Sequence, residues 1–123
     1  MREEQVVALI LGHVVGDALG VPVEFRSRAE LQADPVQGMR GFGTHHVPAG
    51  SWSDDTSMTL ALMESLVRVG HLDLRDVMEN FRKWMDEAAF TPTDTVFDMG
   101  RTFVRCLSRT FVALAMSLIR WKR

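Results

Sequence analysis

The sequence has a single cysteine, no internal repeat and no low-complexity segment. Because Cys106 has no second cysteine to pair with, an internal disulfide is excluded, and the composition fits a reducing compartment. The longest apolar run, residues 111–119, is interrupted only by Ser117 and is shorter than the roughly 20 residues that span a bilayer. The first residues are acidic and then follow helical periodicity, unlike a signal peptide. We therefore expect a cytoplasmic protein with no membrane partner.

Acidic residues are also lacking, but only at one end of the chain. Residues 101–123 hold six basic residues and no acidic one, whereas residues 1–100 hold 8 Lys and Arg against 16 Asp and Glu. This asymmetry indicates either a functional tail or a segment with a different history. Arg101, Arg105 and Arg109 form a basic ridge at helical spacing. A solvated helix face explains such a ridge without a nucleic-acid partner, which we do not expect.

Strand patterns are absent as well, so the predicted fold class is all-α. The length of 123 residues suits one domain. Gly12 and Gly16, one helical turn apart, predict that another backbone approaches the first helix closely. The irregular stretch between the first two strong helical patterns is long enough to be either functional or disordered, and the strong helices on both sides favour a functional segment. Apolar periodicity predicts helices over residues 3–19, 27–33, 58–67 and 74–87, and a last helix starting near Thr95.

A row of side-chain oxygens stands directly before the second strong helical pattern, in the string GSWSDDTSM at residues 50–58. Ser53, Asp54 and Asp55 are all suited to cap the start of a helix. The same carboxylate and hydroxyl oxygens also suit a hard cation such as Mg²⁺, Mn²⁺ or Ca²⁺. The spacing alone leaves both interpretations open.

Two further carboxylates stand in apolar surroundings. Asp17 falls on the mostly apolar stripe of the first helix, which favours a structural role in which it accepts hydrogen bonds from the following loop. Glu24 lies between apolar residues in the irregular stretch. It either points to water or acts as a catalytic acid or base near a cleft.

The glycine-rich part of the irregular stretch carries two adjacent histidines. His45 and His46 are expected to be exposed, and a zinc site is not predicted because no other soft ligand is close in the sequence. The preceding residues 41–44, GFGT, could bring backbone amides to a phosphate, although they match neither a Walker nor a dinucleotide fingerprint.

Several of these strings occur together in one order that is typical of a known family. GHVVGDALG at 12–20 is followed by Pro22, the pair Glu24-Phe25, WSDDT at 52–56 with Met58, FTP at 90–92 and VFDMG at 96–100. In this combination, residues 1–102 resemble the N-terminal part of the ADP-ribosylglycohydrolase family, of the dinitrogenase-reductase-activating type. Residues 103–123 depart from the family and are expected to form a basic and apolar helical tail.

The resemblance implies a compact all-α fold with a binuclear Mg²⁺ or Mn²⁺ centre. It implies hydrolysis of the glycosidic bond that joins ADP-ribose to a modified protein or a small acceptor. By position, Ser53, Asp54 and Asp55 would be metal ligands, and Glu24 and Asp98 would be catalytic. Gly43, Thr44 and His45 would contact the substrate, and Asp17 and Thr56 would be structural.

The chain also departs from the family pattern, since the family's second metal motif, of the Asp-x-Asp-Thr type, is not found after residue 100. Our hypothesis is a truncated family member with an incomplete site that ends after a frameshift. The alternative is an inactive helical module that binds ADP-ribose or proteins. In either case, apolar helix faces are expected to be exposed and to favour self-association.

Overall fold

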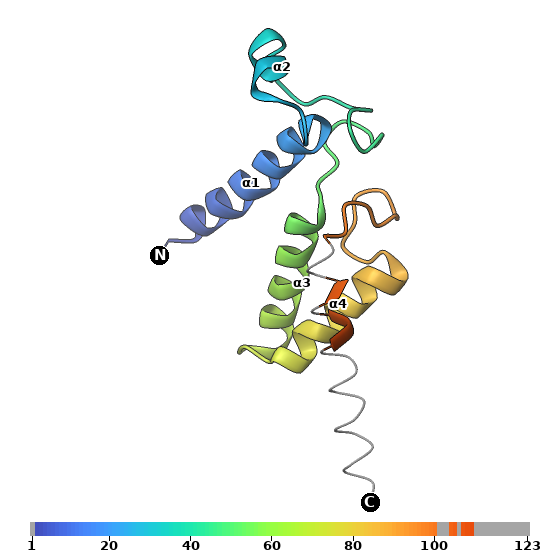
Figure 1. The fold of residues 1–123 in the computed structure, drawn as a ribbon. Coiled ribbons are helices and arrows are strands. Elements are labelled where there is room, and N and C mark those ends of the chain that lie inside the picture. Colours follow the sequence, from blue (N-terminus) through green and yellow to red (C-terminus); the bar gives the residue numbers. More distant parts are fainter. Residues whose placement is uncertain (1, 101–103, 106, 110–123) are drawn as a thin grey trace, which may run out of the picture.

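The protein is described by a computed structural model, which places residues 2–100, 104, 105 and 107–109. These residues are helical or irregular and contain no strand, so the predicted all-α class is confirmed. Figure 1 shows α3 and α4 side by side. The C-terminal end of α1 lies near the start of α3, and the two helix axes are inclined to each other (Figure 1). The elements are α1 (Glu3–Gly20), the 3₁₀ turn η1 (Val21–Val23), α2 (Arg28–Ala33), α3 (Asp54–Val69) and α4 (Leu74–Glu87).

The bounds of α3 and α4 follow from the polar residues and glycine around them. The Ser53 side chain caps α3 by accepting a hydrogen bond from the Asp55 N–H, and the helix ends at Gly70, whose φ of 79° favours glycine. Asp73 caps α4 by accepting from two backbone N–H groups of its first turn. The bounds predicted for α4 are those observed, and the predicted short helix at 27–33 corresponds to α2.

The core lies between α3 and α4. Ala61 of α3 packs there with Val77 and Trp84 of α4, and all three are buried. Asn80 is also buried, and its amide donates a 2.9 Å hydrogen bond to the carbonyl oxygen of Ala61. At the far end of the pair, the Arg68 guanidinium contacts the Asp76 carboxylate at 2.6 Å. This hairpin of helices is the best-packed part of the described chain.

Helix α1 is packed only near its C-terminal end. Ala18 is its one buried residue, whereas Leu9 and Leu11 are 66% and 56% exposed. The predicted close approach at Gly12 and Gly16 is wrong, because no neighbouring heavy atom lies within 4 Å of the position that a Cβ would occupy. The N-terminal part of α1 points away from the hairpin (Figure 1).

By length and composition alone, the segment Glu3–Val23 is long and apolar enough to cross a membrane. An 18-residue window within it has a mean hydropathy of 2.0, and 17% of that window is buried. Core helices of water-soluble proteins and N-terminal signal sequences meet the same criterion, so this property does not assign a location. The shorter apolar run at residues 111–119 lies outside the described residues.

The last predicted helix does not begin near Thr95. Residues 91–100 are irregular, and helical residues next occur at 104, 105 and 107–109. Asp94 and Asp98 both have a φ of 54°, which is left-handed and incompatible with continuing an α-helix. The irregular path matters for function, because it brings Asp98 towards the start of α3.

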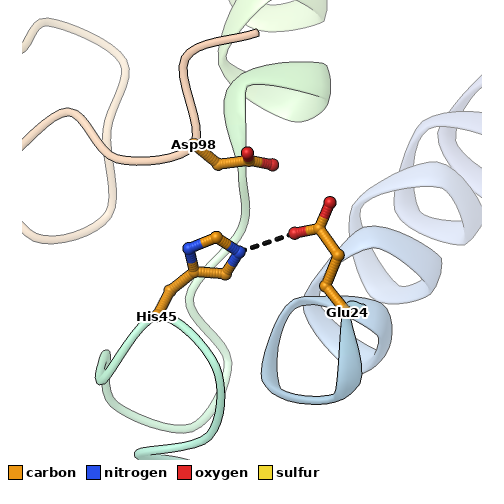
Figure 2. Close-up of side chains that lie close together, drawn as sticks. All are labelled: Glu24, His45 and Asp98. Atoms are coloured by element: carbon orange, nitrogen blue, oxygen red, sulfur yellow. Dashed lines mark hydrogen bonds and ion pairs between the residues drawn. The ribbon is translucent and has the colours of Figure 1, made fainter. Parts of the chain in front are cut away.

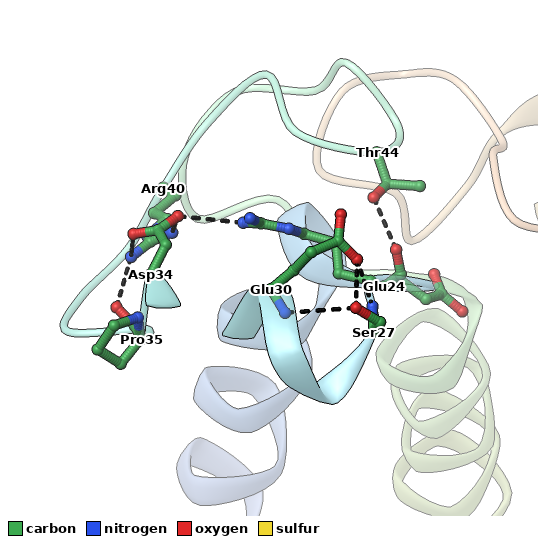
Figure 3. A network of polar contacts seen from close by, with 8 residues as sticks. Glu24, Ser27, Glu30, Asp34, Pro35, Arg40 and Thr44 are labelled. Carbon is green, nitrogen blue, oxygen red and sulfur yellow. Dashed lines mark hydrogen bonds and ion pairs between the residues drawn. The ribbon is translucent and has the colours of Figure 1, made fainter. Parts of the chain in front are cut away.

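The stretch between η1 and α3 is held by polar contacts (Figure 3). Ser27 and Glu30 form a reciprocal cap at the start of α2. The Arg40 guanidinium binds both oxygens of Asp34, at 2.7 and 3.0 Å, and Arg26 contacts the same carboxylate at 3.1 Å. The hydrogen bond from Arg40, and to a smaller extent that from Arg26, lowers the pKa of the Asp34 carboxyl. A stretch without regular structure thus has a defined path over the end of α1.

Candidate active site

A cavity of about 330 Å³ lies where the end of α1, the start of α3 and the two irregular segments meet. Four carboxylates from these four segments line it, and no basic side chain is among the lining residues. The lining residues are Asp17, Gly20, Val21, Val23, Glu24, Ser53, Asp55 and Asp98.

Asp17 connects α1 to the start of α3. One carboxylate oxygen accepts hydrogen bonds from the N–H groups of Ser53, at 3.0 Å, and Thr56, at 3.2 Å. The other accepts from the Ser53 hydroxyl at 2.7 Å. Its partners therefore lie at the start of α3, with Ser53 as the capping residue and Thr56 in the first turn. The expectation that they lie in the loop following α1 is wrong. These bonds satisfy helix-start amides that would otherwise lack a partner.

The same bonds orient the Ser53 hydroxyl. It donates its proton to Asp17 and accepts from the Asp55 N–H at 3.3 Å. Because a hydroxyl oxygen has two lone pairs, one remains for a ligand in the cavity. Thr56 is fully buried near it, and its N–H, like that of Ser53, donates a hydrogen bond to Asp17.

The carboxylates at the start of α3 repel one another and those nearby. Partial burial, followed by the charges of Asp98 and Asp55, raises the pKa of Asp54 to about 6. Asp54 is half-buried, whereas Asp55 is exposed and lines the cavity. The site therefore concentrates negative charge that the described residues do not neutralise.

Glu24, His45 and Asp98 meet at the rim of the cavity (Figure 2). The His45 Nε2 lies 2.6 Å from a Glu24 carboxylate oxygen. The ring centroids of Phe25 and Phe97 lie 6.1 and 5.3 Å from the centroid of the His45 imidazole. The expectation that His45 is exposed is wrong, since its side chain is 14% exposed, whereas His46 is exposed.

Gly43 and Thr44 hold the loop against the backbone next to Glu24. The Thr44 N–H donates to the Pro22 carbonyl at 3.2 Å, and its hydroxyl donates to the Glu24 carbonyl at 2.8 Å. At Gly43, a Cβ would collide with the Pro22 carbonyl, so only glycine allows this approach. These contacts lie within the protein, and the predicted contacts of both residues with a substrate stay a prediction.

The donor set of the cavity fits divalent cations. Carboxylate and hydroxyl oxygens are the ligands that Mg²⁺ and Mn²⁺ prefer, and no lining residue supplies a compensating positive charge. Burial is the main cause of the raised pKa of Asp54, and the neighbouring charges of Asp98 and Asp55 add to it; a bound cation would offset that second contribution. Ser53 and Asp55 line the cavity, and Asp54 lies between them in sequence; their predicted role as metal ligands stays a prediction.

Sequence reasoning missed the approach of His45 to Glu24 and Asp98. Glu24 and His45 are 21 positions apart in the sequence, and the helices α3 and α4 lie between His45 and Asp98. One signal was available, the aromatic residue beside each carboxylate, in Glu24-Phe25 and Phe97-Asp98. Each such pair supplies one carboxylate and one ring to the surroundings of His45.

Comparison with known proteins places these residues in a wider context. A family model described as ADP-ribosylglycohydrolase matches residues 1–119. An ADP-ribosylarginine hydrolase, Tri1, of Serratia proteamaculans is 36% identical over 93 residues, which are 76% of this chain and 25% of that protein. The ADP-ribosyl-(dinitrogen reductase) glycohydrolase of Rhodospirillum rubrum is 39% identical over 84 residues, covering 67% of this chain and 29% of the relative.

A more distant similarity extends further along the chain. A putative ADP-ribosyl glycohydrolase of Acanthamoeba polyphaga mimivirus is 30% identical over 106 residues, or 81% of this chain and 30% of the viral protein. The chain therefore spans between a quarter and a third of the length of the curated relatives that it matches.

Proposed function

Because the chain belongs to the ADP-ribosylglycohydrolase family, we propose that it hydrolyses the glycosidic bond between ADP-ribose and an acceptor. The proposed cofactors are two Mg²⁺ or Mn²⁺ ions, held on one side by Ser53, Asp54 and Asp55. The observation that carries this proposal is the convergence of four carboxylates from four segments on one cavity. The matched part makes up only 25% and 29% of these relatives. Further ligands for both ions would correspond to residues of the relatives that lie outside this matched part.

The proposed chemistry assigns a separate task to each part of the site. Bound divalent cations would polarise the ribose hydroxyls and make a bound water more acidic. Glu24 would act as the acid or base that transfers the proton of this water, because its side chain lines the cavity. Glu24 is the residue directly after η1. Asp98 would position the ribose from the opposite side of the rim. Cleavage at the anomeric carbon would pass through an oxocarbenium-like state, which nearby carboxylates stabilise.

The names of the relatives suggest the class of substrate. Two hydrolases named for ADP-ribosylarginine, from Serratia proteamaculans and Pseudomonas putida, match this chain, as does a glycohydrolase named for ADP-ribosylated dinitrogen reductase. An ADP-ribosylated protein or a small ADP-ribosylated acceptor is therefore the proposed substrate. Gly43, Thr44 and His45 are proposed to contact its ADP-ribose part.

Calorimetric titration of the full chain with ADP-ribose, with and without Mg²⁺, tests the proposal. We expect binding that requires Mg²⁺ and is lost in Asp55→Asn, because that carboxylate lines the cavity. Asp86→Asn is the matched control, since Asp86 is exposed on α4 and is expected to leave binding unchanged. Binding that is equally strong without Mg²⁺, or no binding in a folded sample, would contradict the proposal.

A second candidate function is that of a non-catalytic helical module. The apolar side chains of α1 favour it, since Val7, Leu9, Leu11 and Val15 are between 45% and 66% exposed. Exposed apolar surface of this kind promotes contact between proteins, including self-association. A chelator separates the two candidates, because hydrolysis would stop without divalent ions whereas association through α1 would continue.

A further inference from the structure

We propose that Glu24, His45 and Asp98 together bind one divalent transition-metal ion at the rim of the cavity, where Glu24 and Asp98 also line the proposed active site. This site differs from the Mg²⁺ positions proposed above, because its ligands come from the two irregular segments and include an imidazole. It does not rest on the proposed hydrolase activity, since it concerns only the coordination of an ion by three described side chains.

The first support is convergence from distant parts of the chain. One potential ligand atom from each of the three side chains lies within 4.8 Å of the other two. Around a single Zn²⁺ with bonds of about 2.1 Å, neighbouring ligand atoms lie roughly 3.4 Å apart. Small side-chain rotations therefore bring the three atoms to bonding distance. Figure 2 shows Asp98 and Glu24 on either side of the space that the imidazole faces.

The second support is that no other described side chain binds the Asp98 carboxylate. It is half-buried, and no side-chain hydrogen bond or ion pair joins it to another described residue. A bound metal ion would give this carboxylate the partner that the described side chains do not supply. The left-handed φ of 54° at this residue also shows that the backbone adopts an uncommon conformation where it carries the carboxylate to the rim.

The third support is the ligand type. Imidazole nitrogen suits zinc, copper, iron and nickel, whereas Mg²⁺ is bound by oxygen and keeps several waters. His45 is 14% exposed and has aromatic rings near it, at centroid distances of 6.1 and 5.3 Å, which limit the orientations of its ring. Its Nε2 already faces the carboxylate of Glu24, at 2.6 Å. An ion entering here would take the place of the hydrogen that the two groups share.

Calorimetric titration of the full chain with Zn²⁺, in a buffer that holds excess Mg²⁺, is the test. We expect one Zn²⁺ per chain to bind at this site in the presence of Mg²⁺. His45→Asn should weaken the binding at least about tenfold, because the loss of even an outer-shell partner of a metal ligand typically costs 10–100-fold in affinity. His46→Asn is the matched control, since this exposed neighbour has a φ of 55°, which asparagine tolerates.

Asp98→Asn and Asp55→Asn complete the design. Asp98→Asn should weaken Zn²⁺ binding as His45→Asn does, whereas Asp55→Asn should weaken Mg²⁺ binding and leave Zn²⁺ bound. The visible absorption of Co²⁺, added in place of Zn²⁺, should lose intensity in His45→Asn while the helical circular dichroism stays unchanged. Equal Zn²⁺ affinity in wild type and His45→Asn, equal losses in both histidine variants, or complete displacement of Zn²⁺ by Mg²⁺ would overturn the proposal.

Discussion

Helix α1 and the α3–α4 hairpin are both rich in apolar residues, but different forces hold them in place. The hairpin buries Ala61, Val77 and Trp84 against one another, with the buried amide of Asn80 bridging the two helices. In α1 only Ala18 is buried, although an 18-residue window of the segment Glu3–Val23 has a mean hydropathy of 2.0. The more apolar helix is therefore the less buried one.

What attaches α1 to the rest of the fold is mainly polar. Asp17 accepts three hydrogen bonds from Ser53 and Thr56, and the His13 ring lies 3.2 Å from the Thr59 hydroxyl. The same Ser53 belongs to the candidate cation site. The attachment of α1 and the geometry of the site thus depend on one set of hydrogen bonds, whereas the stability of the hairpin depends on apolar burial.

The largest expected effect is on the hairpin. Trp84→Ala should lower the free energy of unfolding by about 3–5 kcal/mol, because the side chain is 1% exposed and its removal leaves a cavity. Leu9→Ala, on the 66% exposed side chain in α1, should change it by no more than about 0.5 kcal/mol. Urea unfolding followed by circular dichroism compares the two. Similar losses would show that α1 is packed as the hairpin is.

The next effect concerns the polar attachment of α1. Asp17→Ala should cost about 2 kcal/mol, because it leaves the N–H groups of Ser53 and Thr56 without an acceptor. It should also weaken Mg²⁺ binding, since the Ser53 hydroxyl loses its orienting partner. Asp86→Ala, at an exposed position on α4, is the control for both measurements. If Asp17→Ala weakens stability but leaves Mg²⁺ affinity unchanged, the proposed link between attachment and site is wrong.

A smaller effect is expected from the charge of Asp54. Its pKa of about 6 in the folded chain lies above the ordinary value of about 3.9, so the folded state binds the proton more tightly. Without cations, stability should therefore decrease as pH rises from about 4 to about 6. Asp54→Asn should remove this decrease and raise stability at pH 7 by on the order of 1 kcal/mol, a value reduced for solvent screening.

Thermal unfolding of wild type and Asp54→Asn in EDTA, from pH 4 to pH 7, measures the difference. Asp86→Asn again serves as the control, because its carboxylate is exposed and lies on α4. A wild-type stability that rises with pH while Asp54→Asn stays level would contradict the assignment.

The smallest effect on folding is expected at the exposed face of α1. Leu11→Lys should change the free energy of unfolding by no more than about 0.5 kcal/mol, because Leu11 is 56% exposed. The same change should reduce self-association in sedimentation velocity, since it places a charge on the apolar face. An unchanged sedimentation profile in a self-associating sample would show that contacts between chains use another surface.

Local chemistry explains which parts of the fold could be predicted from sequence. The bounds of α4 follow from the cap at Asp73 and from an apolar stripe with helical period, both of which lie within a few residues. The helix predicted near Thr95 failed because the left-handed conformations of Asp94 and Asp98 depend on tertiary structure. The packing of α1 could not be predicted either, since an apolar stripe does not show which element covers it.

The candidate site also has one part that could be predicted from the sequence and one part that could not. Ser53, Asp54 and Asp55 are consecutive, so their shared position at the start of α3 follows from the sequence. Asp17 could be identified as a residue that accepts hydrogen bonds, but its partners lie 36 and 39 positions away. The approach of His45 to Glu24 depends on the path of the loop, which the close contact of Gly43 with Pro22 fixes.

The most direct test of the central claim is whether Mg²⁺ stabilises the folded chain through the oxygens at the start of α3. Thermal unfolding at increasing Mg²⁺ should show a melting temperature that rises with the logarithm of the concentration, because an ion that binds only the folded state stabilises it by mass action. The rise should be absent in Asp55→Asn and unchanged in Asp86→Asn. A melting temperature that does not change with Mg²⁺ concentration, or that rises equally in Asp55→Asn, would contradict the account.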